Sequence, residues 1–270
     1  MMKKPLYVPK YYMTTPNVSE SELRVASQTY KVVKGEQEAM YFGSRRMENV
    51  DFPSFKVYSQ EYYAVDKYTV YYKGVAVYRL QNNDFKYLGD DYVSYGQKVY
   101  YHNQPVSGID YDSVRYMGDF CIVDKNSVYL RGKQLIGADP DTFEVFNNKF
   151  ARDKNSVYFM GVKIADLDSA NFVMLNDEVG KDLHFVYSNT RKITGADAAT
   201  FRVIDSFYGE DKHAIYSLYN LLTIKHADRD TFQVLGFGYA KDKNYVYEFG
   251  EIVKGENPKT FVLDIPPIQY

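Results

Sequence analysis

Apolar residues recur along this chain at a nearly constant spacing. One position of the pattern holds an aromatic residue in almost every copy and is occupied by Phe55, Phe85, Val114, Phe143, Phe172, Phe201, Phe232 and Phe261. Neighbouring members lie 29 residues apart, with a step of 30 at the first pair and of 31 between Phe201 and Phe232. The residues eight before and two after this position are also apolar in every copy. A fixed period of this length predicts a tandem array of about eight copies of one 29-residue unit.

A second, polar signature repeats with the same period. The run Asp124 to Tyr129, read as DKNSVY, recurs from Asp153 and, as DKNYVY, from Asp242. Weaker copies begin at Asp66, Asp182 and Asp211. This signature resembles that of the DKNYY family of bacterial repeat proteins, over roughly residues 33–263. The resemblance implies a bacterial repeat protein and brings no known activity with it.

Each unit is predicted to be mostly β. In the copy that begins at Asp124, strands are expected near residues 128–131, 133–136, 143–146 and 150–153, where β-branched, aromatic and alternating apolar residues gather. Gly132 supplies the positive φ of a tight hairpin between the first two. Asp139 followed by Pro140 predicts a single helical turn or a type I turn. The aspartate of the DKN run is expected to accept hydrogen bonds from N–H groups of its own turn.

Such a unit is too small to be stable alone, so neighbouring units must stack on one another. The fold class predicted is therefore all-β: a tandem array of about eight 29-residue, hairpin-rich repeats forming an open, curved, solenoid-like sheet. A closed, propeller-like ring is the alternative. The array is expected to be one repeat domain, 30–263. An N-terminal cap or tail, 1–29, with a short helix starting near Asn17, and a C-terminal tail, 264–270, would flank it.

Charge and composition exclude several function classes. The formal net charge is −2, from 33 basic and 35 acidic residues, which gives no reason to expect nucleic acid as a partner. No apolar run is long enough to insert into a membrane, and no signal peptide is visible at the N-terminus. The expected location is the cytoplasm, or the periplasm or cell envelope if a signal has been removed. Tyr and Phe are abundant, at 29 and 17 residues, which favours strands.

Candidate chemistry is sparse. His184 and His213 share one repeat position, which suits a metal pair or, more simply, two exposed turn residues. Pairs such as Asp139 and Asp141 suit calcium, but the rest of a calcium loop is absent and the first aspartate is explained as a turn cap. Cys121 occupies a position that is apolar or aromatic elsewhere, so it is interpreted as a buried structural residue. The sequence thus predicts a protein that is not an enzyme, with no cofactor and no metal site.

The tyrosine of the Val-Tyr pair, or of its close variant, at the end of the signature forms a stripe along the repeats. Two interpretations stay open: an exposed aromatic ladder that binds glycan or peptide, or a sheet covered on both faces with both residues in the core. The members are Tyr41, Tyr71, Tyr100, Tyr129, Tyr158, Tyr187, Tyr216 and Tyr247.

One copy contains two extra residues, between Tyr216 and Ile224. The repeating apolar positions are already filled there, so Leu218, Tyr219, Leu221 and Leu222 are predicted to form part of a protein-binding or self-association surface. The alternative is that the longer loop packs on its own repeat. The function expected is a non-enzymatic, protein-binding repeat scaffold, a monomer or weak homo-oligomer. A toxin-neutralising immunity protein is its most concrete form, and an envelope module that binds glycan or peptide is the alternative.

Overall fold

The computed structural model describes residues 30–33, 39–58 and 62–263. The chain divides into two compact units, 1–111 and 112–270. The predicted N-terminal cap, its short helix and the C-terminal tail lie outside the described residues. The division falls within a 3-10 turn, η2, Tyr111–Ser113.

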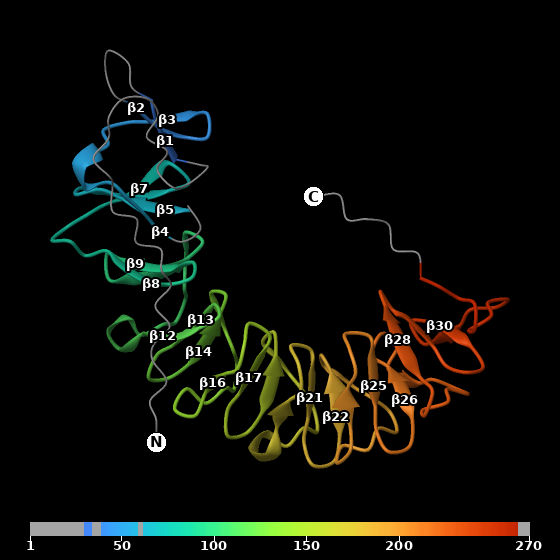
Figure 1. The fold of residues 1–270 in the computed structure, drawn as a ribbon. Helices are drawn as coiled ribbons and strands as arrows, with labels where there is room; N and C mark the ends of the chain where they lie inside the picture. Colours follow the sequence, from blue (N-terminus) through green and yellow to red (C-terminus); the bar gives the residue numbers. More distant parts are fainter. Residues whose placement is uncertain (1–29, 34–38, 59–61, 264–270) are drawn as a thin grey trace, which may run out of the picture. The chain divides into compact units, whose positions relative to one another are not determined.

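The described part of the N-terminal unit holds three small antiparallel sheets, coloured blue to green in Figure 1. The first is three-stranded and the other two are four-stranded. Their strands are β1 (Tyr30–Val33), β2 (Ala39–Phe42) and β3 (Arg45–Met47); β4 (Lys56–Tyr58), β5 (Tyr63–Val65), β6 (Thr69–Tyr72) and β7 (Val75–Arg79); and β8 (Lys86–Gly89), β9 (Tyr92–Tyr95), β10 (Lys98–Tyr101) and β11 (Gln104–Pro105), with a 3-10 turn η1 (Phe52–Ser54) before β4.

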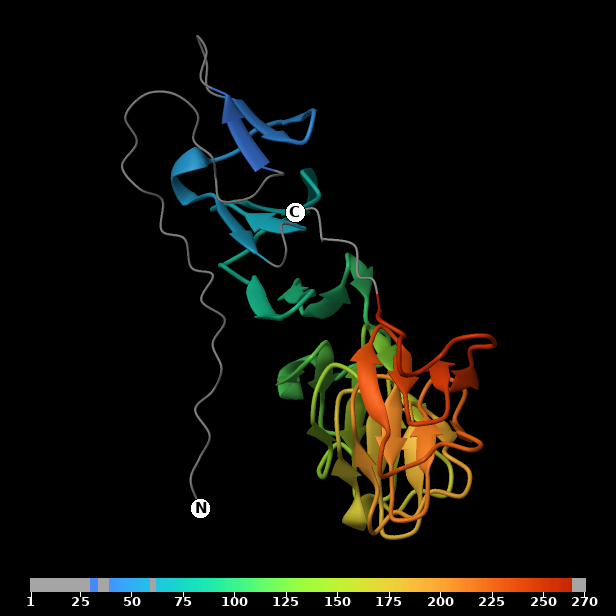
Figure 2. The ribbon, with the colours of Figure 1, turned by 45° about the vertical axis from the view of Figure 1, so that its right-hand side comes forward.

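The C-terminal unit holds five four-stranded antiparallel sheets. Figures 1 and 2 show them following one another in chain order, in a row that bends in Figure 1. The strands are β12 (Arg115–Gly118), β13 (Cys121–Val123), β14 (Val128–Leu130) and β15 (Lys133–Gln134); β16 (Glu144–Val145), β17 (Phe150–Arg152), β18 (Val157–Phe159) and β19 (Val162–Lys163); β20 (Val173–Met174), β21 (Val179–Lys181), β22 (Val186–Ser188) and β23 (Arg191–Lys192), with η3 (Ser169–Asn171) before β20; β24 (Arg202–Val203), β25 (Tyr208–Glu210), β26 (Ile215–Ser217) and β27 (Leu222–Thr223); and β28 (Gln233–Gly236), β29 (Tyr239–Lys241), β30 (Val246–Glu248) and β31 (Glu251–Ile252).

The predicted all-β class and serial array are confirmed. Among the described residues, the eight sheets follow one another in chain order and no sheet closes on itself. The strands expected in the copy from Asp124 appear as β14, β15, β16 and β17, in the expected places. Each sheet is a separate short meander, with strands of two to five residues.

Each four-stranded meander has two ends that differ in chemistry. At one end, called here the signature end, lie the DKN turn between the second and third strands and the capping turn that leads into the first strand. At the other, called the tip end, lie the two hairpin turns that join the first to the second strand and the third to the fourth. Because every repeat has the same order, all signature turns of a unit lie at one end of the sheets and all tips at the other.

The hydrophobic cores of the C-terminal unit lie between successive sheets. One core combines Cys121 and Val128 of the β12–β15 sheet with Phe143 and Tyr158 of the next repeat. The next combines Phe150 and Val157 with the following Phe and Tyr, and the pattern continues to the last sheet. Burial of apolar side chains therefore couples each repeat to its neighbours, as expected for units that are too small alone.

Both residues of the Val-Tyr pair are buried in the C-terminal unit. The tyrosine rings of this position pack against the aromatic anchor before their own sheet, at centroid distances of 5.8 Å for Phe143 and Tyr158 and 5.7 Å for Phe201 and Tyr216. The valine faces the next core. Of the two interpretations of the stripe, the covered sheet is confirmed for the buried members, and the exposed ladder is wrong for Tyr71, Tyr129, Tyr158, Tyr187, Tyr216 and Tyr247.

The aspartate of the signature is buried and forms the centre of a hydrogen-bond network. One carboxylate oxygen of Asp153 accepts from the backbone N–H groups of Asn155 and Ser156, as the sequence predicts. The other accepts from the N–H of Asp139 at 2.8 Å and from the phenol of Tyr158 at 2.9 Å. The carboxylate thus satisfies the DKN turn, the capping turn and the buried phenol together, which a buried charge requires.

The same network recurs at Asp66, Asp211 and Asp242, where the phenols of Tyr71, Tyr216 and Tyr247 each donate to the carboxylate at 2.8 Å. Burial alone would raise the pKa of Asp242, but the hydrogen bonds donated to it outweigh this effect and its pKa lies below the usual range. The signature is therefore a folding element.

The lysine of the signature closes the capping turn from outside. The ammonium group of Lys212 pairs with Asp197 at 2.8 Å, and its backbone N–H donates to the hydroxyl of Thr200 at 3.1 Å. Lys243 and Asp228 form the same pair in the next repeat. The Lys212 ammonium holds the pKa of Asp197 down to about 2.

A small residue on the second strand makes room for the aromatic anchor. The ring of Phe172 lies on the backbone of Gly180, where an added Cβ would come within 2.3 Å of it, and Phe201 covers Gly209 in the same way. Ala64, Ala151 and Ala240 hold this position opposite other Phe anchors, whereas Ile122 holds it where the anchor is Val114. In the C-terminal unit, ring size and the opposing side chain are therefore complementary, whereas in the N-terminal unit Val93 holds this position beside the Phe85 anchor.

Candidate functional site

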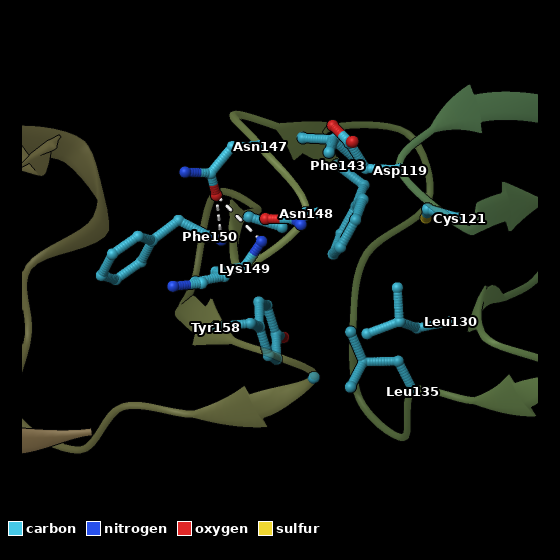
Figure 3. A pocket seen from close by; sticks show the side chains of 13 residues that line it. Asp119, Cys121, Leu130, Leu135, Phe143, Asn147, Asn148, Lys149, Phe150 and Tyr158 are labelled. Carbon is cyan, nitrogen blue, oxygen red and sulfur yellow. Dashed lines mark hydrogen bonds between the residues drawn. The ribbon is translucent and has the colours of Figure 1, made fainter. Parts of the chain in front are cut away.

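Cys121 lies at the wall of a small pocket in the C-terminal unit, together with Leu130, Leu135, Phe143 and Tyr158 (Figure 3). The pocket has room of about 20 Å³, which is the space of a single water molecule. Burial raises the pKa of the Cys121 thiol to about 12, so the thiolate needed for nucleophilic attack is scarce at neutral pH. The prediction of a buried structural cysteine is confirmed.

The histidines and aspartate pairs are held in turns. The backbone N–H groups of His184 and His213 donate to Asp182 and Asp211, the role that Asn155 has in its own repeat, and both histidines are exposed. Asp139 accepts from the N–H of Asp141, as a cap does. Within the described ranges, no three His, Cys, Asp or Glu side chains come together in a way that could hold a metal ion.

The N-terminal unit has a larger hollow, of about 560 Å³, between the β4–β7 sheet and the turn before η1. Its lining includes Tyr71 and Tyr78, whose phenols already donate to Asp66 and Asp84 at 2.8 and 2.9 Å. These hydroxyl groups are therefore committed to the fold and not directed at a ligand.

The two-residue insertion forms the tip between β26 and β27 and divides into an inner and an outer face. Leu218 and Leu221 are buried, with 7% and 6% of their surface exposed. Tyr219 and Leu222 point outward, with 68% and 57% exposed. All four were predicted to lie on the surface because every repeating apolar position was already filled. That prediction is wrong for Leu218 and Leu221.

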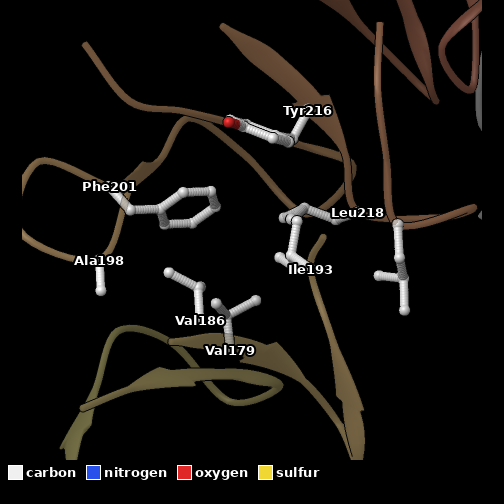
Figure 4. Close-up of a cluster of buried hydrophobic side chains, with 8 residues drawn as sticks. Val179, Val186, Ile193, Ala198, Phe201, Tyr216 and Leu218 are labelled. Carbon is white, nitrogen blue, oxygen red and sulfur yellow. The ribbon is translucent and has the colours of Figure 1, made fainter. Parts of the chain in front are cut away.

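The buried pair completes the core between two sheets. Leu218 lies with Val179, Val186 and Ile193 of the preceding repeat and with Phe201 of its own (Figure 4). Leu221 belongs to the same core. Two extra residues lengthen the tip enough for it to fold back over this core. The alternative, in which the longer loop packs on the fold, therefore holds for Leu218 and Leu221 but not for Tyr219 and Leu222.

Backbone hydrogen bonds fix the conformation of this tip. The N–H of Leu218 donates to Phe207 O at 2.7 Å, and the N–H of Leu221 donates to Ser217 O at 2.9 Å. Leu221 has a φ of 64°, a conformation that is uncommon for a branched side chain and is held here by burial. The outward side chains of Tyr219 and Leu222 are consequently presented on a rigid loop.

The outer face continues onto the next tip. The rings of Tyr219 and Phe249 lie 4.9 Å apart, and Phe249 also meets Phe207 edge to face at 5.2 Å. The ring of Phe249 rests on Gly238, where an added Cβ would lie 2.3 Å from it. Phe237, beside that glycine, has 62% of its surface exposed. We call Phe207, Tyr219, Leu222, Phe237 and Phe249 the tip cluster.

Residues 34–93 and 121–251 match the DKNYY family, and this is more than two thirds of the chain. The chain belongs to the DKNYY family. No curated protein and no solved structure matches it. The residues between the two matched stretches of this DKNYY protein, 94–120, include the division between its two compact units.

The DKNYY signature and the tip cluster lie at opposite ends of the sheets. The signature residues form the hydrogen-bond network around the buried aspartate. The motif that gives the family its name therefore stabilises the repeat fold. No repeating pattern in the sequence could have revealed Phe207, Phe237 or Phe249, because tip positions differ from one repeat to the next. No helix in the described ranges is long and apolar enough to cross a membrane.

Proposed function

We propose that this DKNYY protein is a non-catalytic bacterial scaffold that binds a protein partner through the tip cluster. The observation that carries the proposal is the division of the insertion. Leu218 and Leu221 anchor the loop in the core, while Tyr219 and Leu222 stay exposed on it. Exposed aromatic and aliphatic side chains grouped on a rigid element are typical of protein-contact sites.

At the tip end, the same backbone hydrogen bond recurs in every repeat of the C-terminal unit, while the side chains vary. In each sheet of the C-terminal unit, the N–H of one tip residue donates to the carbonyl of the facing tip, at 2.6–2.9 Å. No pair of side chains at these positions occurs twice. The pairs are Phe120 with Arg131, Lys149 with Met160, Glu178 with Asn189, Phe207 with Leu218 and Gly238 with Phe249. A scaffold that holds varied side chains in fixed places suits recognition of one particular partner.

The edge strand below the cluster also supports binding there. Natural proteins place charges on edge strands to prevent pairing with other chains. The fourth strands β15, β19, β23 and β31 all carry a charged residue, whereas β27, Leu222–Thr223, carries none. The edge that Leu222 occupies is therefore the least protected of the five in this unit.

A toxin-neutralising immunity protein in the cytoplasm, monomeric or weakly self-associating, rests on the repeat surface and the near-neutral net charge. Glycan or peptide binding by the Val-Tyr stripe in the cell envelope is not favoured, because six of the eight phenols are buried.

Site-specific photo-crosslinking in the organism that encodes the chain tests the proposal. A photoreactive phenylalanine analogue is placed at Tyr219 and, as a control, at Tyr245, an exposed aromatic residue of the signature end. We expect one protein adduct from position 219, identified by mass spectrometry, that disappears when Leu222 and Phe237 are replaced by Ser. The absence of a protein adduct at 219, or equal adducts at both positions, would overturn the proposal.

A further inference from the structure

The carboxylates beside the tip cluster indicate what kind of group it receives. Glu248 and Glu251 flank the tip formed by Phe249 and Gly250 and face each other directly across β30 and β31. Like charges directly opposite one another in an antiparallel pair destabilise the sheet. The fold keeps both at the tip end of its last described sheet.

The side chains that donate to these carboxylates are neutral. The phenol of Tyr239 donates to Glu248 at 2.7 Å, and the side-chain amide of Asn220 donates to Glu251 at 3.4 Å. Within the part of the chain that the structure describes, neither glutamate forms an ion pair. The segments that build the tip cluster, 204–208, 217–222, 235–239 and 248–251, contain no Lys, Arg or His.

The other sheets of the unit do not share this charge arrangement. At the two positions equivalent to Glu248 and Glu251, the other four sheets have different pairs. These are Leu130 opposite Lys133, Phe159 opposite Val162, Ser188 opposite Arg191 and Ser217 opposite Leu222. An exposed aromatic cluster and an unneutralised pair of carboxylates therefore occur together only at this end of the described unit.

Aromatic faces beside carboxylates are the surroundings that a guanidinium group prefers. Its planar cation stacks on a ring through cation–π attraction and donates parallel hydrogen bonds to carboxylate oxygens. A cation placed between Glu248 and Glu251 would also relieve their mutual repulsion. A lysine ammonium is more strongly hydrated and lacks the planar, bidentate geometry.

We propose that the tip cluster receives an arginine side chain of the protein partner, held by Glu248 and Glu251 and stacked on the ring of Tyr219 or Phe249. This rests on the proposed function, because it names the chemistry of the partner at the same site. The partner surface is accordingly basic, with apolar residues beside the arginine to cover Leu222 and Phe237.

Selection from a random dodecapeptide phage library on the purified full-length chain tests this inference. We expect the selected peptides to share an arginine next to apolar residues. Replacing that arginine by citrulline, its neutral isostere, should weaken binding about tenfold or more, as should E248Q/E251Q in the protein. The matched control, D141N/D230N, changes the net charge equally at the signature end and should leave the affinity unchanged.

The outcomes separate the two proposals. Peptides whose binding is lost in Y219S/F237S but which lack arginine, or which bind E248Q/E251Q equally well, would overturn the arginine site and leave protein binding at the tip cluster standing. Failure to select any peptide whose binding depends on Tyr219 would count against both. Equal weakening by D141N/D230N would show that overall charge, and not these two glutamates, attracts the peptide, and would also overturn the arginine site.

Discussion

The phenol of Tyr158 donates a 2.9 Å hydrogen bond to the carboxylate of Asp153, five residues earlier in the chain. Both groups are buried. The bond links the DKN turn to the strand that follows it, and the same carboxylate oxygen holds the N–H of Asp139 in the preceding capping turn. The contact thus joins the two most recognisable elements of the repeat.

Removing this carboxylate should cost more than removing its phenol partner. Asp153→Ala leaves four donors without their acceptor and should lower the unfolding free energy by about 3 kcal/mol or more. Tyr158→Phe removes one hydrogen bond and should cost about 1 kcal/mol. Urea denaturation measures both, with the exposed Asp141→Ala as the control. Equal losses for the two variants would show that the network is not centred on the aspartate.

The buried phenols predict an alkaline limit to stability. Burial, followed by the hydrogen bond to Asp153, raises the pKa of Tyr158 from its ordinary value of 10.0 to about 12. Burial also raises the pKa of Tyr208 to about 12. These phenols ionise more easily in the unfolded chain, so their contribution is complete below about pH 10 and is lost as the pH rises through about 12. Tyrosinate absorbance and circular dichroism should change together in one transition. Phenol titration with the fold intact would contradict this account.

The carboxylate network predicts the acidic limit in the same way. The pKa of Asp211 lies below the usual range, because hydrogen bonds from Asp197, His213 and Tyr216 outweigh the effect of burial. A depressed folded-state pKa stabilises the fold above the unfolded value, near 4, and this contribution is lost as the pH falls through the folded value. Stability should therefore decline below about pH 4. A melting temperature that stays constant as the pH is lowered below about 4 would contradict this prediction.

The fit between ring and strand predicts a specific pair of variants. Gly209→Ala places a Cβ within 2.5 Å of the Phe201 ring and should cost about 1–3 kcal/mol. Phe201→Leu in the same chain should restore part of that loss, because the repeat that has the smaller Val114 as its anchor carries the larger Ile122 at the matching strand position. A double-mutant cycle measures the coupling. Strictly additive losses would mean that the two positions are independent.

The anchors themselves should contribute strongly to stability. Phe143, Phe172 and Phe201 are all buried between sheets. Truncation of each to Ala should cost about 3–5 kcal/mol in chemical denaturation. A loss below about 1 kcal/mol at all three would remove the anchors from the core.

Periodicity in the sequence was sufficient for the repeat, the strand positions, the capping turns and the burial of Cys121 and of the anchors Phe143, Phe172 and Phe201. It reports which positions are apolar in every copy, but it did not show that Tyr87 and Tyr116, at one of these positions, are exposed. It could not show whether the Val-Tyr stripe is covered, because alternation alone does not say whether a second layer exists. The phenol–carboxylate bond also remained unseen, since two polar groups at fixed spacing carry no apolar signal.

The sequence predicted only part of the candidate site, because periodicity reports only the positions that repeat in every copy. The insertion after Tyr216 breaks the register, so no repeat position assigned Leu218 and Leu221 to the core. Phe249 and Phe237 lie at tip positions that vary between copies, and their approach to Tyr219 depends on how the last two sheets pack. The two extra residues identified the loop, but they could not show which of its side chains are buried and which are exposed.

The loop between β26 and β27 contributes two buried leucines to the core and two exposed side chains that the fold does not need. The changes in unfolding free energy of two matched double variants distinguish these two roles. L218S/L221S should lose several kcal/mol, because two buried leucines leave the core between sheets. Y219S/L222S should change stability by less than about 0.5 kcal/mol. If Y219S/L222S destabilises the protein as much as L218S/L221S, the outer residues belong to the fold and the account is contradicted.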